Sequence, residues 1–215
     1  MDSIYSLWRK RLYQIFLPLS KRLTSAALMG SYLLMGLGVL ALYGCYQTYS
    51  NTATPQQENL IADSFCFPVG PPNAKGYYNA QKFTQNDHLG EDWNGVGGKN
   101  TDLGDSIYAV ANGEVMLSER ADGGWGNVVI IQHTLSNGSQ VESLYGHCDT
   151  MFVHQGEWVK KGTPIATIGT AFGRYYAHLH FEIRDSIGMG VRWGYHPDTT
   201  GYVNPTAFIL QHNNH

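Results

Sequence analysis

The stretch SIYAVANGEVML, residues 106–117, decides the fold class. Two runs of residues that favour β-strands, 106–111 and 114–117, lie on either side of Asn112-Gly113, a dipeptide typical of tight hairpin turns. The stretch therefore predicts two antiparallel strands joined by a hairpin.

The same alternation of strand-type runs and turn residues continues toward the C-terminus. Residues 128–132 (VVIIQ) lie between Gly-Gly and Asn-Gly pairs, and residues 158–159 and 165–168 lie on either side of a Lys-Gly-Thr-Pro turn. After residue 60, a helical spacing of apolar residues is found over Pro205 to Leu210 only. We therefore expect an all-β, antiparallel domain.

Composition agrees with a folded β-rich chain. Of 215 residues, 43 % are apolar and 14 % are charged, whereas a disordered chain carries more charge and fewer aromatics. The 25 glycines and 14 tyrosines favour short strands and tight turns over a helical bundle. Residues 50–215 carry an excess of acidic side chains, which argues against nucleic acid as a partner.

The N-terminal region predicts one membrane span. Residues 24–46 contain no Asp, Glu, Lys, Arg or His and would cover roughly 34 Å as a helix, enough to cross a hydrocarbon core of about 30 Å. Five cations precede this segment and the next is Lys75, so the positive-inside rule places residues 1–23 in the cytoplasm and the C-terminal domain outside. We expect a single-pass protein of the bacterial cell membrane.

Two alternatives to this anchor remain open. Residues 1–45 could be removed as a signal peptide, or Leu42-Tyr-Gly-Cys45 could be a lipobox with Cys45 lipidated. All three readings export the domain. Residues 47–63 are polar and predict a linker, residues 64–210 form one domain, and residues 211–215 form a tail. Cys66 and Cys148 could form a disulfide in an oxidising compartment or remain free thiols.

Residues 177–184 (AHLHFEIR) alternate strictly between apolar and polar types. In a strand, the odd positions would face a core, and His178, His180, Glu182 and Arg184 would share the other face. Two imidazoles about 7 Å apart would then point into one cleft. This spacing suits one metal ligand with a second histidine beside the open coordination position.

Two further histidines have an ordered setting. His88 and Asp92 are separated by a glycine-containing stretch, so a turn can bring their side chains to one ion. His147 ends another predicted strand and is free to act as an acid or base. Two His and one Asp, with water as fourth ligand, are typical of a catalytic zinc site, whereas closed structural sites usually use Cys. His133 ends the VVIIQ strand and is expected to be a packed or edge histidine rather than a catalyst.

These residues carry a family resemblance that covers roughly residues 66–208. In chain order it rests on HLGED (88–92), GDSIYAVANG (104–113), GNVVI (126–130), YGH (145–147), the stretch 156–162 and HLHFE (178–182). Together they resemble the lysostaphin-type (LytM-like) zinc metallopeptidases.

The resemblance implies an antiparallel β-domain with a groove that acts on the peptides of bacterial peptidoglycan. It implies zinc, one ion per chain, held by His88, Asp92 and His180, with His147 and His178 as the catalytic pair. Two positions depart from the usual pattern. Glu91 replaces an apolar residue and is expected to face solvent rather than to add negative charge near the metal. Cys148 replaces a leucine.

The expected function is a membrane-anchored zinc metalloendopeptidase. No His-Glu-x-x-His segment is present, so an imidazole would have to serve as the base. The alternative is a non-enzymatic adaptor that binds or activates a cell-wall hydrolase. Loss of a metal-ligand position would indicate an adaptor, but this chain keeps all five site positions. A lipoyl-type carrier module, suggested by residues 156–162, does not fit because Lys160-Lys161 precede a Gly-Thr-Pro turn. A regulatory partner is left open.

Overall fold

The structure is a computed structural model that describes residues 60–213. Residues 1–59 and 214–215 lie outside the described residues. The first range holds the predicted cytoplasmic segment, the predicted membrane helix and all but the end of the predicted linker. Between residues 60 and 213, no helix is both long and apolar enough to cross a membrane.

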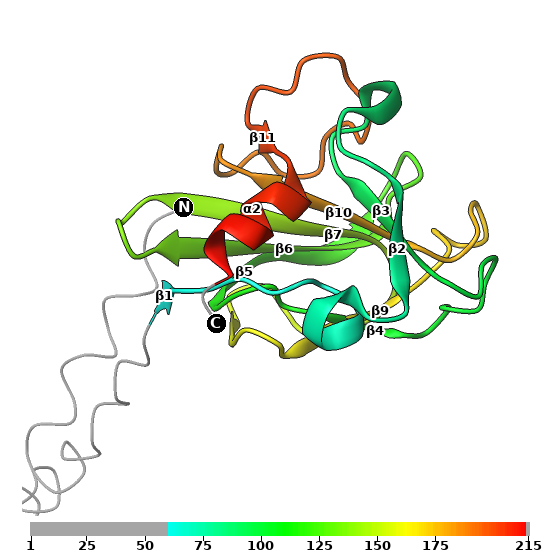
Figure 1. The fold of residues 1–215 in the computed structure, drawn as a ribbon, viewed down its shortest axis with the longest axis horizontal. Helices are drawn as coiled ribbons and strands as arrows, with labels where there is room; N and C mark the ends of the chain where they lie inside the picture. The colour runs from blue at the N-terminus through cyan, green and yellow to red at the C-terminus, as the bar shows by residue number, and fades with distance from the viewer. Residues whose placement is uncertain (1–59, 214–215) are drawn as a thin grey trace, which may run out of the picture. The chain divides into compact units, whose positions relative to one another are not determined.

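The described chain folds as one sheet with three short helices (Figure 1). The strands are β1 (Ile61–Ala62), β2 (Tyr77–Gln81), β3 (Glu91–Gly95), β4 (Ser106–Tyr108), β5 (Gly113–Ala121), β6 (Gly126–Leu135), β7 (Gln140–Met151), β8 (Trp158–Val159), β9 (Pro164–Ile168), β10 (Leu179–Arg184) and β11 (Tyr202–Val203). The helices are η1 (Gly70–Ala74), η2 (Gln85–Asp87) and α2 (Pro205–His212).

The sheet is antiparallel apart from the pairing of β1 with β6. Its main path runs β2-β3-β10-β7-β6-β5-β8, while β9 pairs with both β4 and β7. The expectation of an antiparallel β-domain is confirmed. The two residues of β1 fall within the stretch predicted to be linker.

The predicted hairpin at Asn112-Gly113 is wrong. The strands on either side do not pair with each other, because β4 pairs with β9 whereas β5 pairs with β6 and β8. A Cβ on Gly113 would lie 2.5 Å from the carbonyl oxygen of Gln132, so glycine permits close approach of β6 rather than a tight turn. The Asn112 side chain accepts a hydrogen bond from the backbone N–H of Lys161 at 2.9 Å.

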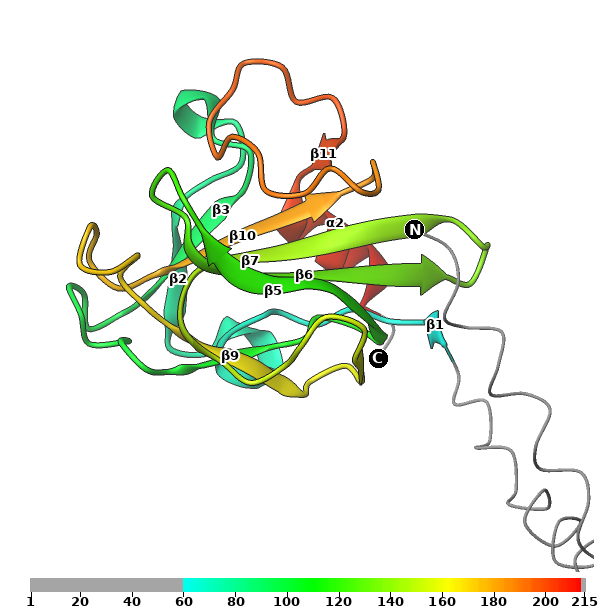
Figure 2. The same cartoon turned by 180° about the vertical axis from the view of Figure 1, so that it is seen from behind.

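The two faces of the sheet bury different cores. Leu179, Phe181 and Ile183 of β10 join the main core, as their alternation predicts, together with Ile209 of α2. Figure 1 shows α2 lying across β6, β7 and β10 on this side. The other face, seen in Figure 2, has a small cluster of Trp125, Val128, Ile130 and Leu144, against which Val191 of the β10–β11 loop packs.

Helix α2 confirms the helical spacing found over Pro205 to Leu210 and extends it to His212. Its N-cap is Asn204, whose side chain accepts a hydrogen bond from the backbone N–H of Ala207 at 2.8 Å. The helix also explains Glu91, for which the expectation of solvent exposure is wrong. Glu91 is buried, and its carboxylate accepts a hydrogen bond from the Thr206 hydroxyl at 2.7 Å.

The two cysteines of the domain are free thiols in the structure. Cys148 is buried in the main core, and burial raises the pKa of its thiol to about 12. Cys66 is half-buried, and burial raises its pKa as well. Neither thiol is therefore set up as a nucleophile at neutral pH.

Candidate metal centre and groove

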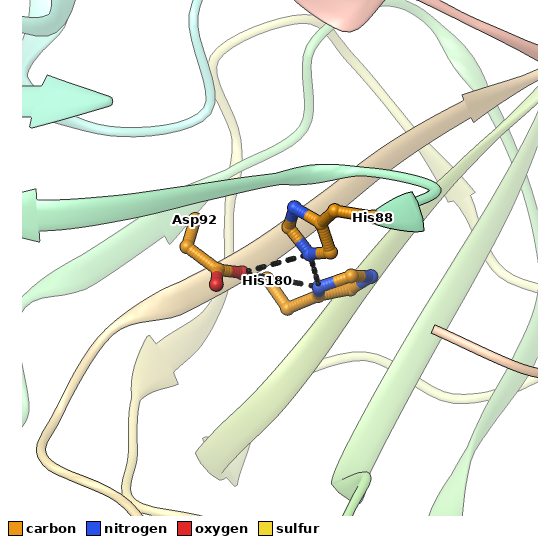
Figure 3. A group of neighbouring side chains, drawn as sticks. All are labelled: His88, Asp92 and His180. Atoms are coloured by element: carbon orange, nitrogen blue, oxygen red, sulfur yellow. Dashed lines mark hydrogen bonds and ion pairs between the residues drawn. The ribbon is translucent and has the colours of Figure 1, made fainter. Parts of the chain in front are cut away.

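The side chains of His88, Asp92 and His180 meet on the face of the sheet opposite the main core (Figure 3). Asp92 and His180 belong to neighbouring strands, and His88 lies in the turn before β3. Asp92 in β3 lies directly opposite His180 in the antiparallel partner β10, which places the two side chains on one face. His88 follows η2 and is held by an isolated β-bridge to Tyr195. The structure thus brings together the three residues predicted as metal ligands.

Gly90 allows this approach. A Cβ on this residue would lie 2.6 Å from the carbonyl oxygen of Phe181 and 3.0 Å from Cε1 of His180. Any larger side chain would push the turn that carries His88 away from β10. The glycine between His88 and Asp92 is therefore required by close packing.

The donor atoms of the three side chains face one another. Nε2 of His88 lies 3.0 Å from Nδ1 of His180, and Oδ1 of Asp92 lies 3.3 Å and 3.1 Å from these two nitrogens. Tetrahedral zinc with ligands at about 2.0–2.1 Å separates neighbouring donor atoms by about 3.3 Å. The residues fit a zinc ion with little rearrangement.

The charges around this cluster favour a cation at its centre. Burial would raise the pKa of Asp92, but hydrogen bonds with His180 and His88 outweigh it and hold this pKa well below its usual range. Burial would lower the pKa of His180, but hydrogen bonds to Asp92 and Glu182 raise it to about 9. Asp92 is therefore an ionised carboxylate at the place where the three donors meet, and Asp92 and Glu182 together stabilise positive charge on the His180 ring.

A buried carboxylate lies behind His180. Oε1 of Glu182 is 2.9 Å from Nε2 of His180, and its Oε2 accepts a hydrogen bond from Nε of Arg184 at 2.7 Å. Both side chains are fully buried, and Arg184 also donates to the carbonyl oxygen of Gly190. These contacts run along the polar face of β10 predicted from its alternation.

The two predicted catalytic histidines lie beside this cluster. The rings of His147 and His178 are 4.7 Å apart, and Nε2 of His178 is 3.9 Å from Oδ1 of Asp92. Nδ1 of His147 is 3.0 Å from the carbonyl oxygen of Trp125, and Nδ1 of His178 is 2.8 Å from that of Tyr176. Because a carbonyl only accepts, each Nδ1 carries the proton and each Nε2 is left as an acceptor.

His147 is held in an uncommon backbone conformation. Its φ is 61°, and its backbone N–H also donates to the carbonyl oxygen of Trp125 at 2.9 Å. Burial, with smaller contributions from His180 and His178, lowers the pKa of His147 to about 3. This imidazole is therefore neutral at neutral pH and can accept a proton.

The donor set and the two neighbouring histidines open to solvent through a hollow of about 320 Å³. Part of its wall is formed by aromatic residues that the sequence analysis did not predict at the site. The ring of Tyr195 stacks on His88 at 4.8 Å, Trp125 packs edge-on against His180 at 5.0 Å, and Tyr175 lies 5.1 Å from His147. Each comes from a loop, where periodicity carries no information. The glycines around Trp125 are the one available signal.

His133 belongs neither to the donor set nor to the lining of this hollow. His133 is buried, with Nδ1 2.8 Å from the carbonyl oxygen of Asn112 and Nε2 2.8 Å from the hydroxyl of Ser143. The expectation of a packed histidine is confirmed.

Comparison with known sequences identifies the family. The sequence pattern of Peptidase family M23 matches residues 88–193, a range that contains all five predicted site residues. Over 81 residues the chain is 46 % identical to Lipoprotein NlpD of Yersinia enterocolitica, covering 38 % of this chain and 78 % of that protein. The chain belongs to peptidase family M23.

Other relatives carry names of a different kind. The chain is 42 % identical over 81 residues to Murein hydrolase activator NlpD of Escherichia coli K12, which is 38 % of this chain and 20 % of that protein. It therefore spans about a fifth of that relative's length. The structure of the SpoIIIAH and SpoIIQ complex matches with a TM-score of 0.50 and 22 % identity, covering 67 % of this chain and 99 % of the matched one, and supports the fold alone.

Proposed function

We propose that this chain is a zinc-dependent endopeptidase that hydrolyses peptide bonds of bacterial peptidoglycan. One observation carries the proposal: a fitting His-Asp-His donor set lies beside two histidines that both present Nε2 as an acceptor. A protein that only binds through this groove has no need of all five groups.

Zinc bound by His88, Asp92 and His180 supplies Lewis-acid chemistry that activates water and polarises a carbonyl group. The protein's own part is proton transfer and orientation. Neutral His147 or His178 accepts the proton of the attacking water at Nε2. The same proton is then delivered to the leaving amine, directly or through the partner histidine, so that both imidazoles are neutral again when the bond has broken.

The aromatic walls orient the substrate. Tyr195 and Trp125 pack against the His88 and His180 rings, which fixes the ring planes. The hydroxyl of Tyr195 donates to Oε1 of Gln81 at 3.1 Å, so that wall is itself anchored. A peptide lying in the hollow would be held between this wall and Tyr175.

The proposed substrate requires export. We place residues 60–213 outside the cytoplasm, anchored through the membrane segment predicted at residues 24–46. The name of the Yersinia relative, a lipoprotein, supports a position at the cell envelope.

The names of the relatives favour a second candidate function, activation of a separate murein hydrolase. The purified full chain, incubated alone with purified sacculi and zinc, separates the two. An endopeptidase releases new amino termini, which mass spectrometry of the muropeptides detects, and a chelator abolishes the release. An activator releases nothing by itself and accelerates a murein hydrolase added afterwards.

A further inference from the structure

A second hollow continues the groove beyond His178. It has a volume of about 760 Å³ and is shaped by residues 170–176 and the 100–103 turn. Tyr175 and His178 line both hollows, so the two are neighbouring parts of one surface. A peptide whose reacting bond lies beside His178 would place an adjoining residue here.

Arg174 lies at the boundary between the hollows. It lines the second hollow, and a Cβ on Gly124, which lines the first, would be 3.2 Å from its Cδ and 3.5 Å from its Nη1. The same Cβ would lie 2.7 Å from the hydroxyl of Tyr175. The absence of a side chain at Gly124 thus leaves room for Arg174 beside the catalytic histidines.

The turn that carries Arg174 is fixed by its own hydrogen bonds. The backbone N–H of Gly173 donates to the Thr170 hydroxyl oxygen at 2.9 Å, and that of Tyr175 donates to the Thr170 carbonyl at 3.1 Å. Phe172 is covered by Arg120, whose guanidinium carbon lies 4.4 Å from the ring centre. The start of the Arg174 side chain is therefore held in place.

The second hollow is suited to an anion. Its lining contains one cation, Arg174, and no carboxylate. No carboxylate among residues 60–213 forms an ion pair with Arg174. Oδ1 of Asn100 accepts from the backbone N–H of Ala177 at 2.9 Å, so Nδ2 is left as a donor at this wall.

We infer that this second hollow is a subsite for a carboxylate-bearing residue of the substrate peptide, recognised by Arg174. The inference rests on the proposed function and names its substrate class: peptides with a free carboxylate next to the bond that is cut. A guanidinium binds a carboxylate through two parallel hydrogen bonds, which neither an amide nor a neutral residue reproduces.

Binding and cleavage of two forms of one substrate test the inference. The first form is purified sacculi with free stem-peptide carboxylates, and the second is the same sacculi after conversion of those carboxylates to primary amides with carbodiimide and ammonia. Co-sedimentation of the full chain in the presence of chelator measures binding without cleavage. Initial rates with zinc measure cleavage.

We expect amidation to weaken binding by the wild-type chain on the order of tenfold, the usual size for loss of a charged hydrogen-bonded pair. Arg174→Gln should bind native sacculi as weakly as amidated ones, and Arg174→Lys should discriminate less than the wild type because it lacks the planar fork. Arg192→Gln is the matched control. It removes an exposed arginine that lines neither hollow and does not contact the turn carrying Arg174, and it should retain the full discrimination.

Equal binding of wild type to both forms would overturn the inference, as would full discrimination by Arg174→Gln. Cleavage without discrimination contradicts the subsite and leaves the proposed function standing. Discrimination without cleavage contradicts the proposed function and leaves the subsite standing.

Discussion

Glu182 accepts a hydrogen bond from His180: its Oε1 lies 2.9 Å from Nε2 of the imidazole, and both residues are buried. A carboxylate behind a histidine fixes which ring nitrogen carries the proton, and here it turns Nδ1 toward His88 and Asp92. The sequence places these residues two apart on one strand, so β10 supplies both the donor atom and its support.

Weakening this support should lower the affinity for zinc. We expect Glu182→Gln to bind zinc about 10- to 100-fold more weakly, the usual effect of removing such a partner. Competition with a chromophoric chelator measures the affinity. Glu182→Gln leaves the buried guanidinium of Arg184 without its carboxylate partner. The double variant with Arg184→Met removes that unpaired charge and serves as the control for stability. Unchanged zinc affinity in a folded Glu182→Gln chain would show that Glu182 serves only the fold.

Gly90 should be intolerant of any side chain. Gly90→Ala places a Cβ 2.6 Å from the carbonyl oxygen of Phe181, so β3 or the turn before it must move. We expect loss of zinc and a lower midpoint of thermal unfolding. Gly188→Ala is the comparison, because Gly188 has open space around its Cβ and a φ of 74°. It should lose about 1 kcal/mol through backbone strain and keep its zinc. Normal zinc content in Gly90→Ala would contradict the packing argument.

Acid should destabilise the domain through His133. Burial lowers its pKa from 6.5 to about 4, so the unfolded chain binds this proton at a higher pH than the folded one. The contribution of the neutral His133 to the free energy of unfolding is complete above about pH 6.5 and is lost as the pH falls to about 4, on the order of 3 kcal/mol in total. Urea unfolding at pH 7 and pH 4.5 should show a smaller acid loss in His133→Gln than in the wild type. Equal losses would mean that another group dominates.

The predicted topology is open to a direct test. Residues 24–46 should form one span with the N-terminus in the cytoplasm, because all nearby cations precede it. Protease added to spheroplasts should then digest residues 64–210. Full protection of these residues would contradict the assignment, and a diacylated Cys45 would favour a lipoprotein instead.

The sequence was most informative where side chains alternate. The pattern over residues 177–184 predicts both the core face of β10 and the polar face that carries His180, because strand periodicity alone decides which side a residue takes. The same alternation places His180 on the face where Asp92 lies opposite it in β3. His88 lies in a turn and His147 has a φ of 61°, so periodicity does not place them, and a family resemblance indicated their roles.

The sequence was least informative where tertiary contacts decide. Asn112-Gly113 has the composition of a hairpin turn, yet Gly113 is needed for packing against β6, and its φ is not in the left-handed region. Glu91 was expected in solvent, but α2 covers it and Thr206 supplies its hydrogen bond. Tyr175, Tyr195 and Arg174 reach the groove from loops, where no local pattern indicates which residues face a site.

His180 should bind the metal and His178 should not, and the zinc content of the purified variants distinguishes these two roles. Purified His178→Ala should retain one zinc per chain while its rate falls about 10²- to 10⁴-fold, and His147→Ala should behave alike. His180→Ala, like His88→Ala and Asp92→Ala, should lose zinc and unfold at a lower temperature. Zinc retained by His180→Ala and lost from His178→Ala would reverse the two roles and contradict the account.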